Sequence, residues 1–385
     1  MKKEIRVALI GTGVIAHGHA QEYQDIPGVK IVAACDLLPA KLEAFCDKYG
    51  IENRYADYRE MLARDDLDAV DVCVHNNLHR PLTEKVLESG RHCYCEKPMA
   101  GSWADAKAML DKANELDKHL HIQIASLYTP QAHAAERFIR EGQLGKIYHA
   151  RSYGFRRRGR PFVDGYAEKE FDSKYWAAGG ALYDMGVYHI SLLLYLLGNP
   201  KIERVSGAVY QEMDMDPERR AESGFDVEEL GCGFVKFGGG LTMDILESWA
   251  IHGREFPPSV LAGSKGGLSI WNEGRKDGSP LEYYTELSGS PITADVDPGF
   301  EQYRTRQAHP ELAVYDRSQA RWIAALRGEA EWPKTAEIAL NTMLISEGIY
   351  RSSAEGREFT AEEIIAGSKS SMIRRQETSF GELVY

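Results

Sequence analysis

The chain contains 385 residues, of which 43% are hydrophobic and 27% are charged, a composition typical of a globular protein with more than one domain. Its formal net charge of −12 argues against nucleic acid as a partner, because phosphate groups bind basic surfaces. We expect no membrane span and no secretory signal, because no apolar run is long enough for either. The six cysteines are scattered, which favours free thiols in a cytoplasmic protein over a disulfide framework.

The first 125 residues alternate between strand and helix patterns. An apolar run at 5–10 (IRVALI) is typical of a strand buried on both faces. Further strands are predicted at 29–35, near 55, at 69–74 and at 92–95, with helices at 14–24, 39–49, 58–63 and 81–89. This alternation predicts an α/β domain over residues 1–125 with a doubly wound parallel sheet of the Rossmann type.

The turn after the first strand has the pattern G-x-G-x-x-A, a variant of the dinucleotide-binding fingerprint. Gly11 permits the tight turn, Gly13 lets the backbone approach a pyrophosphate, and Ala16 lets the helix pack closely on the strand. The helix N-terminus then offers unpaired N–H groups to the phosphates. We therefore predict that the cofactor binds here, at Gly11, Gly13, Val14, Ile15 and Ala16.

Asp36 ends the second predicted strand, about 20 residues after the turn, where a ribose 2′-hydroxyl needs an acceptor. A carboxylate repels the 2′-phosphate of NADP, and no arginine follows in the segment 37–39 (LLP). The sequence therefore favours NAD as the cofactor over NADP.

The segment 87–98 (LESGRHCYCEKP) ends in a Glu-Lys-Pro motif and resembles the Gfo/Idh/MocA family, the relatives of glucose-fructose oxidoreductase and inositol dehydrogenase. The segments 71–79 (DVCVHNNLH), 142–147 (GQLGKI), 179–186 (GGALYDMG) and 352–357 (SSAEGR) resemble the same family. The resemblance implies a second α/β domain, here residues 126–385, with a large, mostly antiparallel sheet. Strand-like runs at 205–210, 231–237 and 241–249, and a hairpin over 260–270, agree with such a sheet. Its open face would be buried in a homo-oligomer, a dimer or tetramer.

Within the Glu-Lys-Pro motif, the resemblance implies that Glu96 and Lys97 lie at the cofactor and that Lys97 reaches the reacting oxygen. The physical case is that hydride removal from a carbinol requires the hydroxyl proton to leave, and a desolvated lysine can relay it. Asn76 and His79 match positions that imply cofactor contact, although His75 replaces the family's usual proline before Asn76.

A second cluster lies on the helix predicted at 187–197 and the residues just before it. The family places an aspartate here, matched by Asp184, and a histidine or tyrosine four residues later. Four residues return to nearly the same helix face, so Asp184 and Tyr188 can point into one cleft. His189 lies one step further. Either Tyr188 is the acid–base group, or local helix geometry brings His189 into that position.

The segment 156–160 (RRRGR) concentrates four arginines on an acidic protein. With the aromatic residues that follow, it predicts a substrate-binding loop or an interface between subunits, a solvated loop being the alternative. The candidate substrate-binding residues are Arg156, Arg158, Tyr166 and Trp176. Leu127 replaces a frequent arginine near the expected site entrance, and no cysteine–histidine spacing predicts a metal site.

These features together predict an enzyme, an NAD(P)-dependent oxidoreductase that transfers a hydride between the nicotinamide and a sugar, cyclitol or glycoside. Two alternatives remain open: an NAD-dependent, redox-neutral glycoside-cleaving enzyme, and a non-catalytic NAD-binding sugar sensor. Retention of Lys97 together with Asp184 argues against the sensor, because a binding protein needs no proton relay.

Overall fold

The computed structural model describes residues 3–253, 258–271, 279–308 and 310–385. The chain forms two compact units, one of Met1–Gln123, Arg317–Glu337 and Lys369–Tyr385, the other of Ile124–Asp316 and Ile338–Ser368. Two late segments thus return to the first unit, which a single boundary after residue 125 does not capture. No described helix is both long and apolar enough to cross a membrane.

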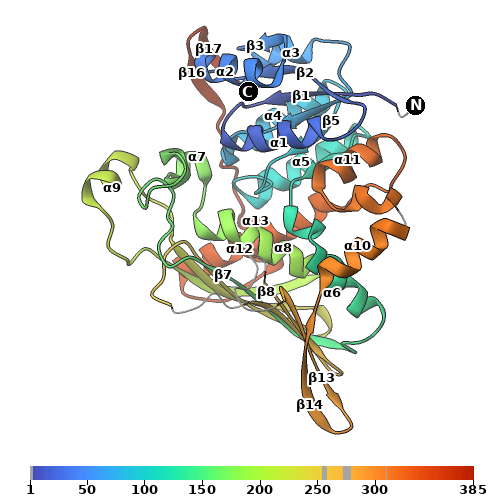
Figure 1. Cartoon of the computed structure of the whole chain (residues 1–385). Helices are drawn as coiled ribbons and strands as arrows, with labels where there is room; N and C mark the ends of the chain where they lie inside the picture. Colours follow the sequence, from blue (N-terminus) through green and yellow to red (C-terminus); the bar gives the residue numbers. More distant parts are fainter. Residues whose placement is uncertain (1–2, 254–257, 272–278, 309) are drawn as a thin grey trace. The chain divides into compact units, whose positions relative to one another are not determined.

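The first unit contains a six-stranded parallel sheet in the order β3-β2-β1-β4-β5-β6 (Figure 1). Its strands are β1 Ile5–Ile10, β2 Val29–Cys35, β3 Asn53–Tyr55, β4 Ala69–Val72, β5 His92–Cys95 and β6 Leu120–Ile122. The predicted Rossmann-type sheet is confirmed. The strand order reverses between β1 and β4, and ligands of such sheets bind at the carboxyl ends of the strands at this switch point.

The helices of the first unit are α1 Val14–Gln24, α2 Pro39–Tyr49, α3 Tyr58–Leu62, α4 Asn76–Glu88, α5 Trp103–Glu115 and α11 Ser318–Leu326. The late helix α11 belongs here because Trp322 and Ile323 pack with Ile5 and Val7 of β1 in one buried cluster. A C-terminal hairpin, β16 Arg375–Thr378 and β17 Gly381–Val384, completes the unit.

Helix α4 begins five residues earlier than the helix predicted at 81–89. Pro81 lies inside it and has no N–H to donate to the carbonyl of Asn77, four residues back. That carbonyl instead accepts the N–H of Ile373, at 2.9 Å, from the C-terminal segment. Pro81 therefore lies inside the helix, where the C-terminal segment binds the carbonyl group that the proline leaves unbonded, and it does not mark the first turn.

The second unit contains a nine-stranded sheet in the order β14-β13-β12-β11-β7-β10-β9-β8-β15. Its strands are β7 Ile147–Phe155, β8 Ile202–Tyr210, β9 Leu230–Phe237, β10 Thr242–Ser248, β11 Ser259–Gly263, β12 Gly267–Ile270, β13 Leu281–Leu287, β14 Ser290–Val296 and β15 Phe359–Thr360. Within this order β7 pairs with β10 in parallel and the other pairs are antiparallel. The predicted mostly antiparallel sheet and the hairpin of β11 and β12 are confirmed.

Helices α8, α12 and α13 lie on one side of this sheet (Figure 1). The helices of the unit are α6 Pro130–Arg140, α7 Lys174–Ala177, α8 Val187–Leu196, α9 Pro217–Ser223, α10 Pro298–Ala308, α12 Thr335–Glu355 and α13 Ala361–Gly367. Short 3₁₀ segments are η1 Ala125–Tyr128, η2 Lys169–Asp172, η4 Gly238–Gly240 and η5 Pro310–Tyr315, and a π-helical turn, η3 Leu182–Gly186, leads into α8.

Glycines in the strands allow the helices to approach the covered face of the sheet. A Cβ at Gly231 would lie 2.4 Å from the side chain of Leu182, and a Cβ at Gly233 would lie 2.6 Å from Ile349 of α12. Both distances are below van der Waals contact. The glycines of β9 therefore set how closely η3 and α12 pack on the sheet.

Candidate functional site

The glycine-rich turn connects β1 to α1 at the switch point of the first sheet. Gly11 has a φ of +91°, and a Cβ there would lie 2.2 Å from the carbonyl oxygen of Cys73. Gly13 has the opposite environment, because a Cβ there would meet none of the described atoms within 4 Å. Gly11 is therefore required by the fold, whereas Gly13 leaves space in front of the turn.

The N-terminus of α1 is open to a ligand. Gly13 caps the helix without a side-chain hydrogen bond, and the first turn contains no acidic residue. Val14 is 80% exposed and Ile15 44% exposed, while Ala16 is buried against the sheet. Uncapped N–H groups and the helix dipole favour an anion at this position.

Asp36 lies beside the turn, at the end of β2. Its Oδ2 accepts the N–H of Thr12 at 2.8 Å and the Thr12 hydroxyl at 2.9 Å, and its Oδ1 accepts the N–H of Leu38 at 2.9 Å. A carboxylate has about four acceptor sites, so a ribose hydroxyl can still bind. The turn therefore holds the carboxylate in place.

The N-terminus of α4 follows β4 at the same edge of the sheet. Asn76 is the first residue of α4 and is partly exposed, and His75 caps the helix without a side-chain hydrogen bond. His79 is fully buried, and its ring nitrogens lie 2.8 Å from the carbonyl oxygen of Pro98 and 3.0 Å from that of Val74. Because both nitrogens face main-chain oxygens, the His79 side chain holds two loops together at this edge of the sheet.

Lys97 follows β5 and is partly exposed. The peptide bond between Lys97 and Pro98 is cis. The N–H of Lys97 donates to Oε2 of the buried Glu96 at 3.1 Å, and Oε1 of Glu96 lies 2.7 Å from Nε2 of His19 in α1. Burial would raise the pKa of Glu96, but the hydrogen bond from His19 and the charges of His19 and Lys97 lower it below its usual value. The loop that carries Lys97 is therefore anchored to α1 through a charged side chain.

Side chains of the kinds that bind metals lie close together at one place in the described residues. His19, Asp71 and Cys73 place ligand-type atoms within 4.8 Å of one another. The distances are those of hydrogen bonds, because Oδ2 of Asp71 lies 2.8 Å from Nδ1 of His19 and the Cys73 thiol lies 3.3 Å from Oδ1 of Asp71. We interpret the group as a proton-bridged cluster.

In the second unit, the segment before α8 is held by a buried carboxylate. Glu228 accepts the N–H of Gly180 at 2.8 Å and the N–H of Leu182 at 3.0 Å. A Cβ at Gly180 would lie 1.9 Å from the carbonyl oxygen of Glu228, and one at Gly179 would lie 2.2 Å from the Tyr350 hydroxyl. The Gly-Gly pair therefore lets this chain segment approach Glu228 and Tyr350, which fixes the start of the helix.

Asp184 lies in the π-helical turn η3 and is partly exposed. Its Oδ2 accepts the indole N–H of the buried Trp249 at 2.8 Å. A π-helical turn has i→i+5 hydrogen bonds, so it rotates residues after it relative to an ordinary α-helix. The structure thus contains the local irregularity that could bring residue 189 toward the side of Asp184.

His189 is buried and lies over strands β7 and β10. Its Nδ1 lies 2.8 Å from Oε2 of Glu247, whose Oε1 accepts the Ser152 hydroxyl at 3.0 Å. A Cβ at Gly154 would lie 1.9 Å from Cε1 of His189, so only glycine fits under the ring. Glu247 lies in β10, and Trp249 directly follows the last residue of that strand. The groups that hold His189 and Asp184 therefore come from one short segment of the chain.

Tyr188 is partly exposed, like Asp184, whereas residues 185–187 between them are buried. This pattern places Tyr188 and Asp184 on the less covered side of the helix, as the four-residue spacing predicts. A carboxylate orients the ring of His189, whereas Tyr188 is the more exposed of the two side chains. Both remain candidates for the acid–base role.

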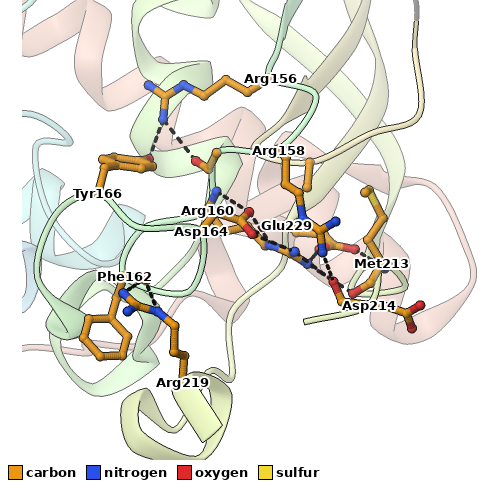
Figure 2. Close-up of polar contacts among 12 residues, drawn as sticks. Arg156, Arg158, Arg160, Phe162, Asp164, Tyr166, Met213, Asp214, Arg219 and Glu229 are labelled. Atoms are coloured by element: carbon orange, nitrogen blue, oxygen red, sulfur yellow. Dashed lines mark hydrogen bonds and ion pairs between the residues drawn. The ribbon is translucent and has the colours of Figure 1, made fainter. Parts of the chain in front are cut away.

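The arginine-rich segment is largely engaged within its own unit (Figure 2). Arg160 is fully buried and donates to Asp164 at 2.8 Å, to Glu229 at 2.8 Å and to the carbonyl oxygens of Met213 and Asp214 at 3.1 and 2.9 Å. Its donors are used to tie the loop to the segment before α9. Arg160 therefore stabilises the loop and is not a substrate-binding residue.

The two arginines predicted to bind substrate also have partners in Figure 2. Arg158 donates to Oδ1 of Asp164 at 3.3 Å and to the Asp214 carbonyl at 2.9 Å. Arg156 donates to the hydroxyl of Tyr166, and its guanidinium lies 4.9 Å from the centre of that ring. Trp176 packs edge-on against the exposed Tyr175. Arg156 and Tyr166 are thus brought together, while Trp176 belongs to a different aromatic pair.

Several residues that build these clusters were not anticipated from the sequence: His19, Asp71, Glu228, Glu247 and Trp249. A signal existed for Asp71, because an acidic residue inside an apolar strand needs a buried partner. Glu228 and Glu247 lie on strands or loops far in sequence from the helix they hold, so their partners follow only from the folded chain.

Comparisons with known proteins agree with these features. Residues 5–124 match the model of an oxidoreductase family with an NAD-binding Rossmann fold, and residues 132–269 match the GFO/IDH/MocA C-terminal domain. The chain is 28% identical over 304 residues to D-glucoside 3-dehydrogenase of Escherichia coli (strain K12), covering 75% of this chain and 81% of that protein.

Two further similarities cover most of the chain. It is 27% identical over 362 residues to D-apiose dehydrogenase of Paraburkholderia graminis, covering 92% of this chain and 89% of that protein. Its fold resembles the solved structure of levoglucosan dehydrogenase in complex with NADH and levoglucosan, with a TM-score of 0.77 at 20% identity over 93% of this chain and 100% of that chain. The last likeness is one of fold.

Proposed function

Because the chain belongs to the Gfo/Idh/MocA family of oxidoreductases, with an NAD-binding Rossmann fold, we propose that it transfers a hydride between NAD and a carbinol or ketone of a sugar, cyclitol or glycoside. The observation that carries the proposal is the anchored loop of Lys97, at the sheet edge where the uncapped N-terminus of α1 lies. The substrate class is supported by the D-glucoside, D-apiose and levoglucosan dehydrogenases among its relatives.

NAD, when bound, supplies the hydride acceptor. We assign the pyrophosphate to the N-terminus of α1 at Gly13, Val14 and Ile15, where N–H groups and the helix dipole favour anions. Asp36 is assigned to the ribose, and its negative charge favours NAD over NADP. Asn76, at the N-terminus of α4, is assigned a further cofactor contact.

The proton of the substrate hydroxyl needs an acceptor when the carbinol is oxidised. We assign Lys97 to hold the reacting oxygen and relay this proton, with Asp184 as a second polar contact. His189 is suited to accept the proton, because Glu247 on Nδ1 fixes the tautomer that leaves Nε2 as the basic nitrogen. Tyr188 is the alternative acid–base group.

We further propose that the open face of the nine-stranded sheet is buried against a second copy of this chain. The strand residues that point away from the helices include the exposed Phe234 and the partly exposed Tyr153, Leu246 and Val260. Apolar area of this kind favours association. Light scattering should give a dimer or tetramer, and Leu246→Glu should shift the population toward monomer.

The six free cysteines support a cytoplasmic location.

The first experiment is a substrate screen that follows the absorbance of NADH with monosaccharides, inositols and glycosides, with NAD and NADP in parallel. We expect NADH to form with one group of carbohydrates and NAD to be preferred. Glycoside cleavage with a flat NADH trace would replace the dehydrogenase with a redox-neutral enzyme. Bound NAD without any turnover would replace it with a sensor.

A further inference from the structure

His19 lies in α1, six residues after Gly13, and is only 2% exposed. Both of its ring nitrogens face carboxylates: Nδ1 lies 2.8 Å from Oδ2 of Asp71 in β4, and Nε2 lies 2.7 Å from Oε1 of Glu96 after β5. The two carboxylates are themselves buried, at 0% and 4% exposure. One imidazole ring therefore joins three separate elements of the first unit.

The protonation state of the ring follows from this geometry. A neutral imidazole has one N–H and one lone pair, so one of the two carboxylates would face a lone pair at hydrogen-bond distance. The carboxylates accept protons from their other neighbours: Asp71 from the Tyr23 hydroxyl at 2.9 Å and the Cys73 thiol at 3.3 Å, and Glu96 from the Lys97 N–H at 3.1 Å. With both carboxylates ionised, only the imidazolium can donate a hydrogen bond to each of them.

The groups around the ring agree with a fixed positive charge. Burial alone would lower the pKa of His19, but the neighbouring Cys73 and Asp71 raise it well above its usual value. Tyr94 packs edge-on at 5.6 Å, and Glu22 on the same helix adds a further carboxylate whose own pKa burial raises. Charge-assisted bonds of this kind are short and strong inside a protein.

We propose that His19 is a permanently protonated positioning residue, which bridges Asp71 to Glu96 and so fixes both the place and the charge balance of Lys97. The inference rests on the function proposed for Lys97. His19 and the partly exposed Lys97 carry positive charge, and the buried Asp71 and Glu96 carry negative charge, so the four charges sum to zero. His19 itself takes no part in proton transfer, because both of its protons are held by carboxylates.

The balance of charges predicts in which direction each variant shifts the pH profile of kcat. Removing the charge of His19 leaves the negative charges of Asp71 and Glu96 uncompensated, and Glu96 interacts electrostatically with Lys97, so Lys97 keeps its proton to higher pH. Removing the charge of Glu96 has the opposite effect. His19→Gln should therefore shift the rise of kcat with pH to higher pH, and Glu96→Gln should shift it to lower pH. If His19 had only a packing role, its replacement would lower the stability of the fold without shifting the pH profile of kcat.

The matched control is His17→Gln, on the same helix two residues earlier. His17 is partly exposed, and its Nδ1 lies 3.1 Å from the Tyr49 hydroxyl, so its replacement should leave kcat and its pH profile unchanged. His19→Gln should lower kcat about 10- to 100-fold through misplacement of the Lys97 loop. The double variant with Glu96→Gln should lose much less than the product of the two single losses, because both act on one bridge.

A measurement on the unmodified full chain keeps the inference testable if His19→Gln does not fold. In ¹⁵N-histidine-labelled protein, one histidine should show two protonated ring nitrogens that stay unchanged from about pH 6 to about pH 9, where an ordinary histidine loses its charge. The assignment to His19 comes from the spectrum of His17→Gln and of the His19 variant. This experiment needs no substrate, so it stands even if the substrate screen fails. A His19 ring with one unprotonated nitrogen, or a His19→Gln enzyme with wild-type kcat and pH profile, would overturn the proposal.

Discussion

Each unit of the molecule buries a histidine against carboxylates, and the two clusters differ in one respect. In the first unit, His19 has a carboxylate at both ring nitrogens, 2.8 and 2.7 Å away. In the second unit, His189 has Glu247 at Nδ1, 2.8 Å away. The first arrangement requires a charged ring, whereas a carboxylate at Nδ1 is compatible with a neutral ring that keeps its proton on Nδ1.

This difference distinguishes a histidine that holds other groups in place from one that can exchange a proton. A ring that must stay charged can hold other groups in place but cannot exchange its proton. A ring that is stable in its neutral form can accept a proton at the other nitrogen and return it, as general acid–base catalysis requires. Replacing His189 should therefore remove a proton acceptor, whereas replacing His19 should displace the Lys97 loop.

The largest expected effect is at Lys97, the group that the first cluster holds. Lys97→Met should lower kcat by about 10³-fold, because the proton relay is lost while the loop and its anchor at Glu96 remain. Affinity for NAD, measured by fluorescence titration, should change far less than kcat. Comparable losses in both quantities would mean that Lys97 acts mainly in cofactor binding.

The second prediction distinguishes His189 from Tyr188. His189→Asn should lower kcat about 10²-fold and remove the part of its pH dependence that comes from His189, leaving the rise set by Lys97, because the group that accepts the proton is removed. Tyr188→Phe, on the neighbouring position, should keep the pH profile. The measurement is kcat over a pH series for both variants. A larger loss and a flattened profile in Tyr188→Phe would move the acid–base role to Tyr188.

The third prediction uses two glycines of the same turn. Gly13→Ala should fold normally, since a Cβ there meets none of the described atoms within 4 Å. It should weaken NAD binding about 10- to 100-fold, because the Cβ would occupy space needed by the pyrophosphate. Gly11→Ala should instead lower the melting temperature, because its Cβ would lie 2.2 Å from the Cys73 carbonyl at a φ of +91°. Equal NAD affinity in wild type and Gly13→Ala would contradict the assigned pyrophosphate site.

The contrast between the units also explains what could be predicted from the sequence. The cofactor turn, Asp36 and the Lys97 loop follow strands with local apolar patterns, so their places in the Rossmann sheet could be predicted from spacing. The environment of His189 depends on Glu247 and Gly154, from strands that become neighbours only in the folded sheet. The hydrogen-bond partners of Arg160 and His79 could not be predicted for the same reason, because they are a distant carboxylate and main-chain oxygens.

Asp172 extends the comparison to a buried acid that the charges of Arg160 and Arg219 compensate only in part. It is fully buried at the end of η2, and neither carboxylate oxygen has a hydrogen-bond partner among the described residues. Burial raises its pKa from 3.8 to about 7. Between these values the folded chain holds a proton that the unfolded chain has lost, so stability falls as pH rises through this window and stays low above about pH 7.

The smallest effect is therefore expected from Asp172→Asn, and its sign depends on pH. At about pH 8.5 the variant removes an unpaired buried charge and should raise the melting temperature by about 2 to 6 °C. At about pH 5 the wild-type side chain is already neutral, so the two proteins should melt within about 1 °C of each other. Calorimetry at both pH values is the measurement. An equal shift at both would mean that the carboxylate is hydrated or paired, and a buried charge would then no longer distinguish this site from the His19 and His189 clusters.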